Sequence, residues 1–410
     1  MHKSRKGRGV VPQAAILTAL LGGSALANGS EPERAHTWSQ AISQVDAACL
    51  LQWISSSPAN EFGIREGCFQ VVEILKCPPQ AVRKGDRVSL QWSREAGEKS
   101  LYFTLGMRNP KGPGIVWEEP FECTCVGFDY VAHAPAFGGK LQKRLPYFLQ
   151  FLDSPDPFII PDARAELAQA SFEDLVALVP YMPRDKFRKM MVDPTIRMDR
   201  LSFPALMLGL SGDAEDAKLF AAKITEKLGS FPDDFRPGVE LLITGYLMLA
   251  GESGLDHLDA WRFKDSSAPF SETIAAMRAL EITWYKGNGK IKRDRMVQSM
   301  RLLLAHPELV DLVIPDLAHW RDWGSLDRIA GLYGQGHFNI PSIKRAVIRY
   351  LQSCVDAKPT DVQPAQAAAA KRYLDRIRRD DPKIFAEAER FISRQNNQEP
   401  SQVSPTVPAR

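Results

Sequence analysis

The chain has 410 residues, of which 44% are hydrophobic and 25% are charged, and its formal net charge is +3. This composition is typical of a soluble globular protein that is long enough for two domains. Beyond the N-terminus no stretch reaches the roughly 18 consecutive apolar residues that a membrane-spanning helix needs, which argues against a membrane-embedded fold.

The N-terminus has the layout of a secretory signal peptide, predicted over residues 1–27. Four basic residues precede an uncharged run whose most apolar part is 14–21, and the small residues Ala25 and Ala27 flank Leu26 at its end. We expect cleavage after Ala27 and hence an exported protein, periplasmic or secreted. The alternative is an uncleaved N-terminal anchor. Removing the segment takes away four positive charges and leaves a formal charge of about −1, so we expect no nucleic-acid partner.

Residues 41–131 are expected to form a small β-barrel or sandwich. Within 87–92 the apolar residues Val88, Leu90 and Trp92 alternate with polar ones, which is typical of a half-buried strand. Several short segments of this kind occur at the spacing of a small all-β fold. The predicted strands are 48–54, 68–75, 87–92, 101–105 and 121–126.

The order of these segments resembles bacterial relatives of netrin-like, OB-type domains. The resemblance is carried by VVEILKCPPQAVRKGDRVSLQW at 71–92 and SLYFTLG at 100–106. These match the V-x-x-V-L-K-G and G-D-x-V-x-L strands of that fold. Cys77 stands where the family usually has glycine, which marks it as a disulfide partner. The resemblance implies a binding or inhibitory module.

Glycine and proline are frequent between the two halves of the chain, and residues 132–140 are predicted to be a linker. From 141 to 395 the pattern predicts about twelve helices without an intervening strand. Such a run favours helix pairs stacked in a row, an all-α HEAT-like solenoid. The tail at 396–410 is polar and rich in proline, and we expect it to be disordered.

The segment 193–228 is the clearest helix pair. Apolar residues recur at helical spacing on both sides of a break at 211–213. Each helix alone leaves an apolar stripe uncovered, which further pairs stacked on it would bury. The segment also resembles HEAT-like repeats through Asp193-Pro194 with Arg197, the run 205–209, and Gly212-Asp213 with Ala217.

A wider resemblance covers roughly residues 40–355. The run FLDSPDPFIIPDARAELA from Phe151, together with 309–351, is similar to uncharacterised exported proteins of planctomycete bacteria. That family brings no assigned activity and no catalytic motif, so the resemblance implies a fold rather than a function.

Export permits disulfide bonds, and most of the cysteines lie in the β-domain. Cys123 and Cys125 on a predicted strand would face the same side and could bind a soft metal. A closed zinc site needs four ligands, however, and no second pair has the required spacing. We therefore predict at least one disulfide within 49–125, a reduced Cys354, and no metal or cofactor. The candidate disulfide residues are Cys49, Cys68, Cys77, Cys123 and Cys125.

Asp316 is the sharpest conflict in the helical part, because a helical wheel places it on an apolar face. A buried carboxylate is costly unless it is paired. We predict a structural polar network of Asp316 with His319 and with Arg345 or Arg349. An Asp–His pair also fits acid–base chemistry, yet no nucleophile motif such as G-x-S-x-G accompanies it, so no catalytic residue is predicted.

The favoured function is an exported interaction or scaffold protein that binds another protein or a cell-envelope component through its helical-repeat surface. Two alternatives remain open. One is an enzyme with a site at the domain junction or around His319. The other is an inhibitor or binding module based on the β-domain.

Overall fold

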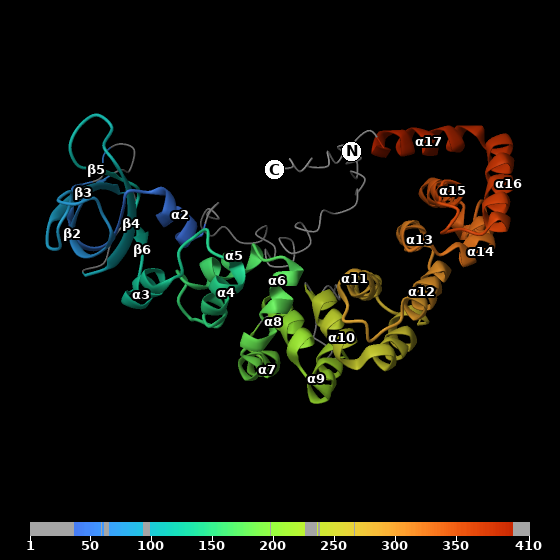
Figure 1. Ribbon diagram of the computed structural model, residues 1–410, viewed down its shortest axis with the longest axis horizontal. Coiled ribbons are helices and arrows are strands. Elements are labelled where there is room, and N and C mark those ends of the chain that lie inside the picture. Colours follow the sequence, from blue (N-terminus) through green and yellow to red (C-terminus); the bar gives the residue numbers. More distant parts are fainter. Residues whose placement is uncertain are drawn as a thin grey trace, which may run out of the picture. The chain divides into compact units, whose positions relative to one another are not determined.

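The computed structural model divides the chain into two compact units (Figure 1), whose described residues lie within 37–187 for the N-terminal unit and within 188–396 for the helical unit. The predicted signal peptide, its cleavage site and the predicted tail beyond residue 396 lie outside the described residues. The structure describes residues 37–58, 60, 65–92, 99–196, 198–225, 236, 238–265 and 267–396.

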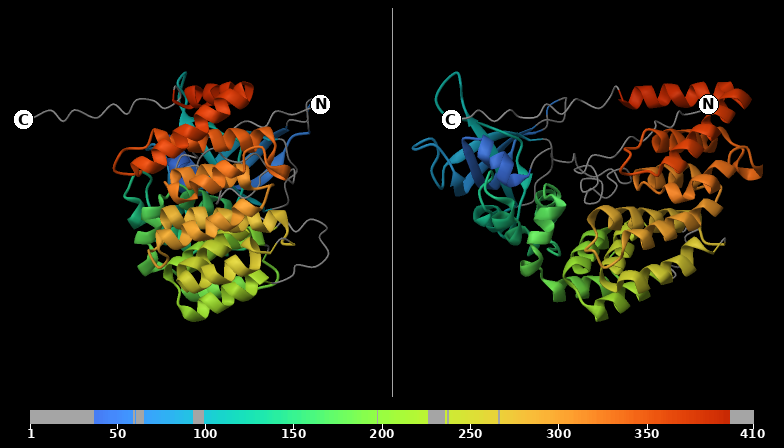
Figure 2. Two further views of the ribbon diagram at one scale, coloured as in Figure 1. Left: turned by 90° about the vertical axis from the view of Figure 1, so that its right-hand side faces the viewer. Right: turned by 45° about the vertical axis from the view of Figure 1, so that its right-hand side comes forward.

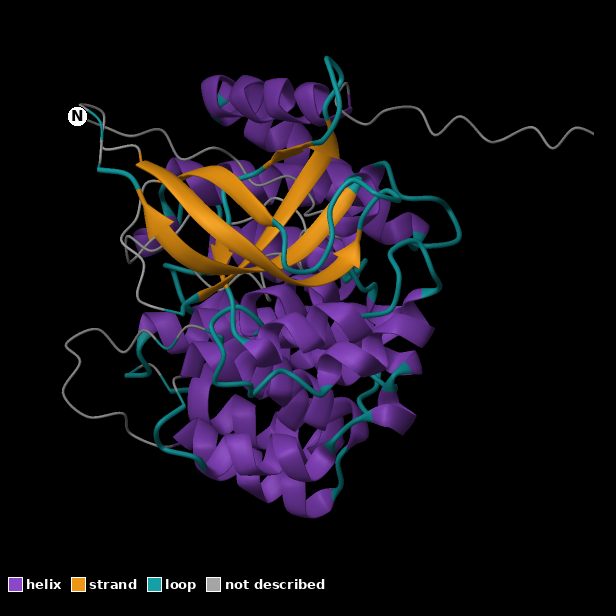
Figure 3. Ribbon diagram, turned by 90° about the vertical axis from the view of Figure 1, so that its left-hand side faces the viewer, coloured by secondary structure: helices purple, strands orange, loops and turns teal. Residues whose placement is uncertain are grey.

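The N-terminal unit contains a near-closed antiparallel β-barrel at residues 47–122, which confirms the predicted β-domain (Figure 3). The strand order is β3-β2-β1-β4-β5, and β6 pairs with β4. The strands are β1 (Ala47–Ser56), β2 (Arg65–Lys76), β3 (Arg87–Trp92), β4 (Leu101–Arg108), β5 (Ile115–Trp117) and β6 (Phe121–Glu122).

Apolar side chains that alternate with polar ones along the strands fill the barrel interior. Residues two apart on a strand face the same side, so Phe69 and Val71 of β2 both enter the core. Phe69 meets Tyr102 of β4 edge-to-face, with ring centroids 5.6 Å apart. The core residues are Cys49, Leu51, Phe69, Val71, Leu90 and Tyr102.

The other face of β4 is also covered, because Phe103 lies against a second aromatic cluster. Its ring is 5.0 Å from that of Trp38, which in turn stacks on Phe158 at 4.5 Å. Trp38 thus packs α2 on the barrel, and this unit contains several helices. They are α2 (Trp38–Gln44), α3 (Cys125–His133), α4 (Leu141–Leu149), α5 (Ile160–Ala168), α6 (Phe172–Ala177), η1 (Val179–Tyr181) and α7 (Arg184–Val192), which continues into the helical unit.

The predicted strand at 121–126 is wrong beyond Glu122, because the chain turns there into α3. Thr124 is the N-cap residue, and its hydroxyl accepts a hydrogen bond of 2.8 Å from the Gly127 amide. Threonine is a favoured capping residue, so the local sequence starts a helix where apolar alternation alone predicted a strand. Helix α3 ends at His133, within the predicted linker, whose role as a boundary stays a prediction.

The helical unit is a row of helices, each packed against the next, which confirms the predicted solenoid (Figure 2). No strand interrupts its described residues. The α-helices are α8 (Met198–Ser211), α9 (Ala214–Thr225), α10 (Val239–Leu258), α11 (Phe270–Lys286), α12 (Arg293–Leu302), α13 (Val310–His319), α14 (Leu326–Gly331), α15 (Pro341–Val355), α16 (Pro364–Asp380) and α17 (Pro382–Asn396). The short connecting turns are η2 (Asp259–Phe263), η3 (Leu303–Ala305), η4 (Trp323–Ser325) and η5 (Gly336–Phe338).

The helix pair predicted in 193–228 is present as α8 and α9, and both pack onto α10. Two glycines let the backbones of α8 and α10 approach closely. A Cβ on Gly209 would lie 2.4 Å from the Gly245 Cα, and a Cβ on Gly245 would lie 2.8 Å from the Ala205 carbonyl oxygen. Only glycine fits this crossing without a shift of the backbone.

Candidate functional site

Asp316 is half-buried in α13, and the charge that acts on it most strongly is that of another acid. The charges that act on it are Glu281 and Arg278 of α11. Of the predicted partners, His319 is exposed near the end of α13 and feels the charge of Glu281, while Arg345 binds Glu387 of α17 at 3.1 Å, so the predicted network stays a prediction. Arg349 interacts electrostatically with Arg345 and with Asp311.

Two contacts join α11 to α13 and show that these helices run side by side in the same direction. Trp284 stacks on Trp320 with ring centroids 4.2 Å apart and planes 10° from parallel. One turn before each tryptophan lie Glu281 and Asp316, and the charge of Glu281 acts on Asp316. We call Glu281 and Asp316 the carboxyl pair.

The carboxyl pair has one cation to share. Arg278 donates from Nη1 to Glu281 Oε2 at 2.8 Å. Glu281 Oε1 is buried, and no hydrogen-bond donor reaches it from the part of the chain that the structure describes. A buried carboxylate oxygen without a donor is costly. A proton on Asp316 supplies the missing donor.

The electrostatics agree with a shared proton. Burial raises the pKa of Asp316 well above its usual range, and the like charge of Glu281 raises it further, while Arg278 opposes the shift. Burial lowers the pKa of His319, against the opposing influence of Glu281. The surroundings therefore favour a protonated Asp316 and a neutral imidazole, a combination that acid–base catalysts use.

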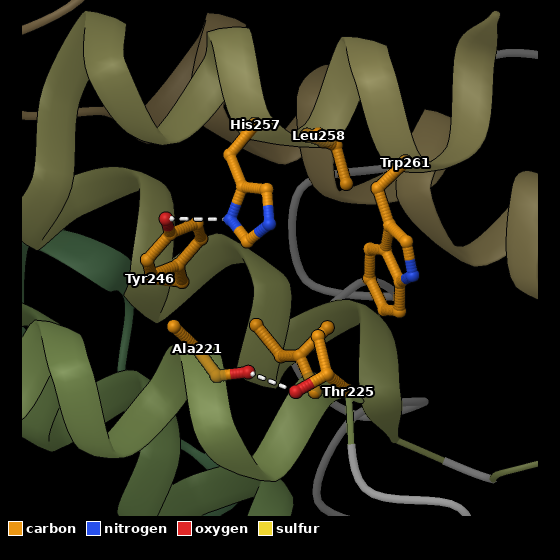
Figure 4. Close-up of a pocket in the computed structure, with 7 residues that line it drawn as sticks. Ala221, Thr225, Tyr246, His257, Leu258 and Trp261 are labelled. Carbon is orange, nitrogen blue, oxygen red and sulfur yellow. Dashed lines mark hydrogen bonds between the residues drawn. The ribbon is translucent and has the colours of Figure 1, made fainter.

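A small cavity lies elsewhere in the helical unit (Figure 4), between α9, α10 and η2. The His257 ring points toward Tyr246, with 3.2 Å between Nδ1 and the phenol oxygen. The space open to the centre of a water molecule is about 10 Å³, which admits about one water and no metabolite. The lining residues are Ala221, Ile224, Thr225, Tyr246, His257, Leu258 and Trp261.

A shallower polar groove of about 470 Å³ runs between residues 321–324 and 359–366. The charged side chains that line the groove already form ion pairs. Arg321 binds Asp361 at 2.7 Å, and Asp322 accepts from Arg301 Nε at 2.9 Å. The Trp323 indole donates to the Asp361 carbonyl at 2.9 Å. These contacts fix the turn before α14 and leave no charge directed at a ligand.

A buried polar network that the sequence did not predict lies in the N-terminal unit. Asp162 of α5 accepts from the Trp38 amide at 2.6 Å and from the Tyr130 hydroxyl at 2.7 Å. Arg144 donates to Glu166 at 2.9 Å, and the Ser39 hydroxyl also donates to Glu166. We call these contacts the α2–α5 network.

The α2–α5 network is a structural link rather than a reactive site. Each carboxylate has donors on both oxygens, and burial followed by Asp162 raises the pKa of Tyr130, which keeps the phenol protonated. Asp162 and Glu166 lie four residues apart on a predicted helix, beside the apolar Ala163 and Leu167. That spacing is the signal that indicates two carboxylates on a buried face.

The cysteines do not form the arrangement expected at Cys123 and Cys125. Cys123 is buried, whereas Cys125 is exposed as the first residue of α3, so the predicted common strand face is wrong. All six cysteines are free thiols in the structure. The predicted disulfide within 49–125 therefore stays a prediction. Within the described ranges, no three His, Cys, Asp or Glu side chains gather at metal-binding distance.

Thiol reactivity should follow burial. In reduced, folded protein we expect iodoacetamide at pH 8 to alkylate the exposed Cys125 first. Burial raises the pKa of Cys49 and Cys123 to about 12 and that of Cys354 to about 11, so these thiols should react at least tenfold more slowly. A mass-spectrometric time course measures each rate. Equal rates for Cys354 and Cys125 would contradict the described packing.

Comparison of the sequence with models of known protein families and with curated proteins finds no match. No helix among the described residues is long and apolar enough to cross a membrane.

Proposed function

We propose that the chain is an exported interaction protein that binds another protein or a cell-envelope component through the layer formed by α11, α13 and α15. Figure 1 shows these three helices following one another along the inner side of the helical row. Export is supported by the order of basic, apolar and small residues at the N-terminus.

The observation that carries the proposal is the distribution of exposed apolar side chains. Among the described residues after 197, the large hydrophobic side chains that are exposed all belong to this layer or to the N-cap of α15. Exposed apolar groups that recur on one layer mark interaction surfaces more often than isolated ones do. They are Phe270, Tyr285, Leu312 and Ile340, with exposed fractions of 51%, 59%, 37% and 44%.

The layer suits a macromolecular partner better than a small molecule. Its helices belong to a repeated row, which presents an extended surface. Neither cavity described above lies on it, and the charged side chain of Arg345 is already paired within the unit. A partner would therefore gain affinity chiefly by covering apolar area.

Site-specific photocrosslinking in the native host tests the proposal. A photoreactive residue at Leu312 or Tyr285 should give the same discrete adduct. A matched control at Val192 of α7, which is 62% exposed, should give none. The substitution Leu312→Asp should abolish the Tyr285 adduct without changing the melting temperature. Identical adducts from Val192 and Leu312 would contradict a binding surface on this layer.

The carboxyl pair favours a second candidate, an acid–base enzyme centred on Asp316. Under this alternative, Asp316→Asn and Glu281→Gln would both fold and would both abolish one activity of the purified protein. The interaction proposal instead expects these variants to keep the crosslinks at Leu312.

A further inference from the structure

We propose that the carboxyl pair makes the contact between α11 and α13 sensitive to pH, with one proton shared by Glu281 and Asp316 holding the two neighbouring helices together. This regulation goes beyond the proposed binding function and does not depend on it. It rests on the donor that the Glu281 carboxylate lacks and on the position of Asp316 beside it.

The surroundings of the carboxyl pair balance one negative charge and not two. Arg278 occupies Glu281 Oε2 at 2.8 Å and balances one carboxylate. When Asp316 is protonated, its hydroxyl supplies the donor that the buried Glu281 Oε1 lacks. When Asp316 loses the proton, two negative charges face each other with one arginine between them, and the Oε1 donor disappears. The repulsion acts directly across the helix contact.

The neighbouring charges do not remove this effect. On α11, Tyr285 is a phenol whose pKa is raised by burial and then by Asp316, so it stays neutral. On α13, His319 has a lowered pKa. Glu240 of α10 lies near Arg278 and has a pKa raised by burial. Other charged groups on the adjoining helices include Arg293, which lies 5.0 Å above the Trp284 ring, and Asp311, Arg345 and Arg349.

The sign of the pH effect follows from the direction of each shift. A carboxyl whose pKa is raised by folding contributes stability at low pH, and this contribution is lost as the pH rises through its folded value. The lowered pKa of His319 acts in the opposite direction, because its contribution is lost as the pH falls through the folded value. The raised pKa of Glu240 changes stability with pH in the same direction as the raised pKa of Asp316. Only a substitution within the carboxyl pair therefore isolates the contribution of the pair.

The test compares melting temperatures of the full chain between pH 5 and pH 8 for the wild type and for Asp316→Asn. The asparagine amide donates to Glu281 at every pH. We expect the melting temperature of the variant minus that of the wild type to grow with pH, by about 3 °C over this range. The control is Glu215→Gln, which changes an exposed carboxylate of α9 and should follow the wild type.

A local measurement separates the helix contact from general stability. The stacked Trp284 and Trp320 rings give an exciton signal in circular dichroism, which should weaken as the pH rises in the wild type and stay constant in Asp316→Asn. Glu281→Gln, which removes the same repulsion from the other side, should also give a constant signal. Parallel pH curves for the wild type and both variants, in melting temperature and in exciton signal, would overturn the proposal.

Discussion

Replacing Glu166 by alanine is expected to lower the free energy of unfolding of the N-terminal unit by about 3 to 5 kcal/mol. The reason is the guanidinium of Arg144, whose side chain is 4% exposed while that of Glu166 is fully buried. Without the carboxylate, Arg144 keeps its charge in a site that water does not reach, and the Ser39 hydroxyl loses its acceptor. Urea unfolding followed by circular dichroism measures the change.

Two comparisons make this result specific. Asp129 forms an exposed pair with His133, so Asp129→Ala should cost less than about 0.5 kcal/mol. The double variant Arg144→Met with Glu166→Leu removes both charges and fills the space, and it should recover most of the loss. A Glu166→Ala protein as stable as Asp129→Ala would show that the ion pair does not hold these helices.

Substituting alanine for Gly209 should destabilise the helical unit by about 1 to 3 kcal/mol, although alanine is the better helix former by about 1 kcal/mol. The added Cβ would lie 2.4 Å from the Gly245 Cα, an atom of the α10 backbone that cannot rotate away. The two helices must separate, and apolar contacts along the whole crossing weaken. Thermal and urea unfolding both report this change.

Gly331→Ala is the matched control, because Gly331 ends α14 and a Cβ there meets no atom within 4 Å. With space available and helical backbone angles, alanine should leave stability unchanged or raise it by up to about 1 kcal/mol. If the two glycine variants shifted stability in the same direction, the close approach of the α8 and α10 backbones would not explain the effect of Gly209→Ala.

The architecture could be predicted because its signals are local. Strands β3 and β4 follow from alternating apolar residues, and α8 and α9 follow from helical spacing interrupted at Gly212. The short strand β5 was missed, since its three residues offer too little pattern to detect. The strand predicted at 121–126 failed because the capping preference of Thr124 outweighed apolar alternation.

The polar contacts could be predicted only in part, because partner choice is a property of the folded arrangement. Asp316, placed on an apolar face by its spacing, is half-buried in the structure. The expectation of a basic partner came from the usual pairing of opposite charges. The actual neighbour, Glu281, lies on a different helix and is brought close by the stacking of Trp284 on Trp320. The spacing of residues within one helix does not show which residues of α11 lie beside those of α13.

The α2–α5 network also sets an order of events during synthesis. The Trp38–Asp162 and Ser39–Glu166 hydrogen bonds join residues 124 and 127 positions apart. At translation rates of about 5 to 20 residues per second, α2 waits roughly 6 to 25 s for its partners to be made. Until α5 is made, α2 can use only its contacts with the barrel, such as that of Trp38 with Phe103, and its polar groups wait for their partners.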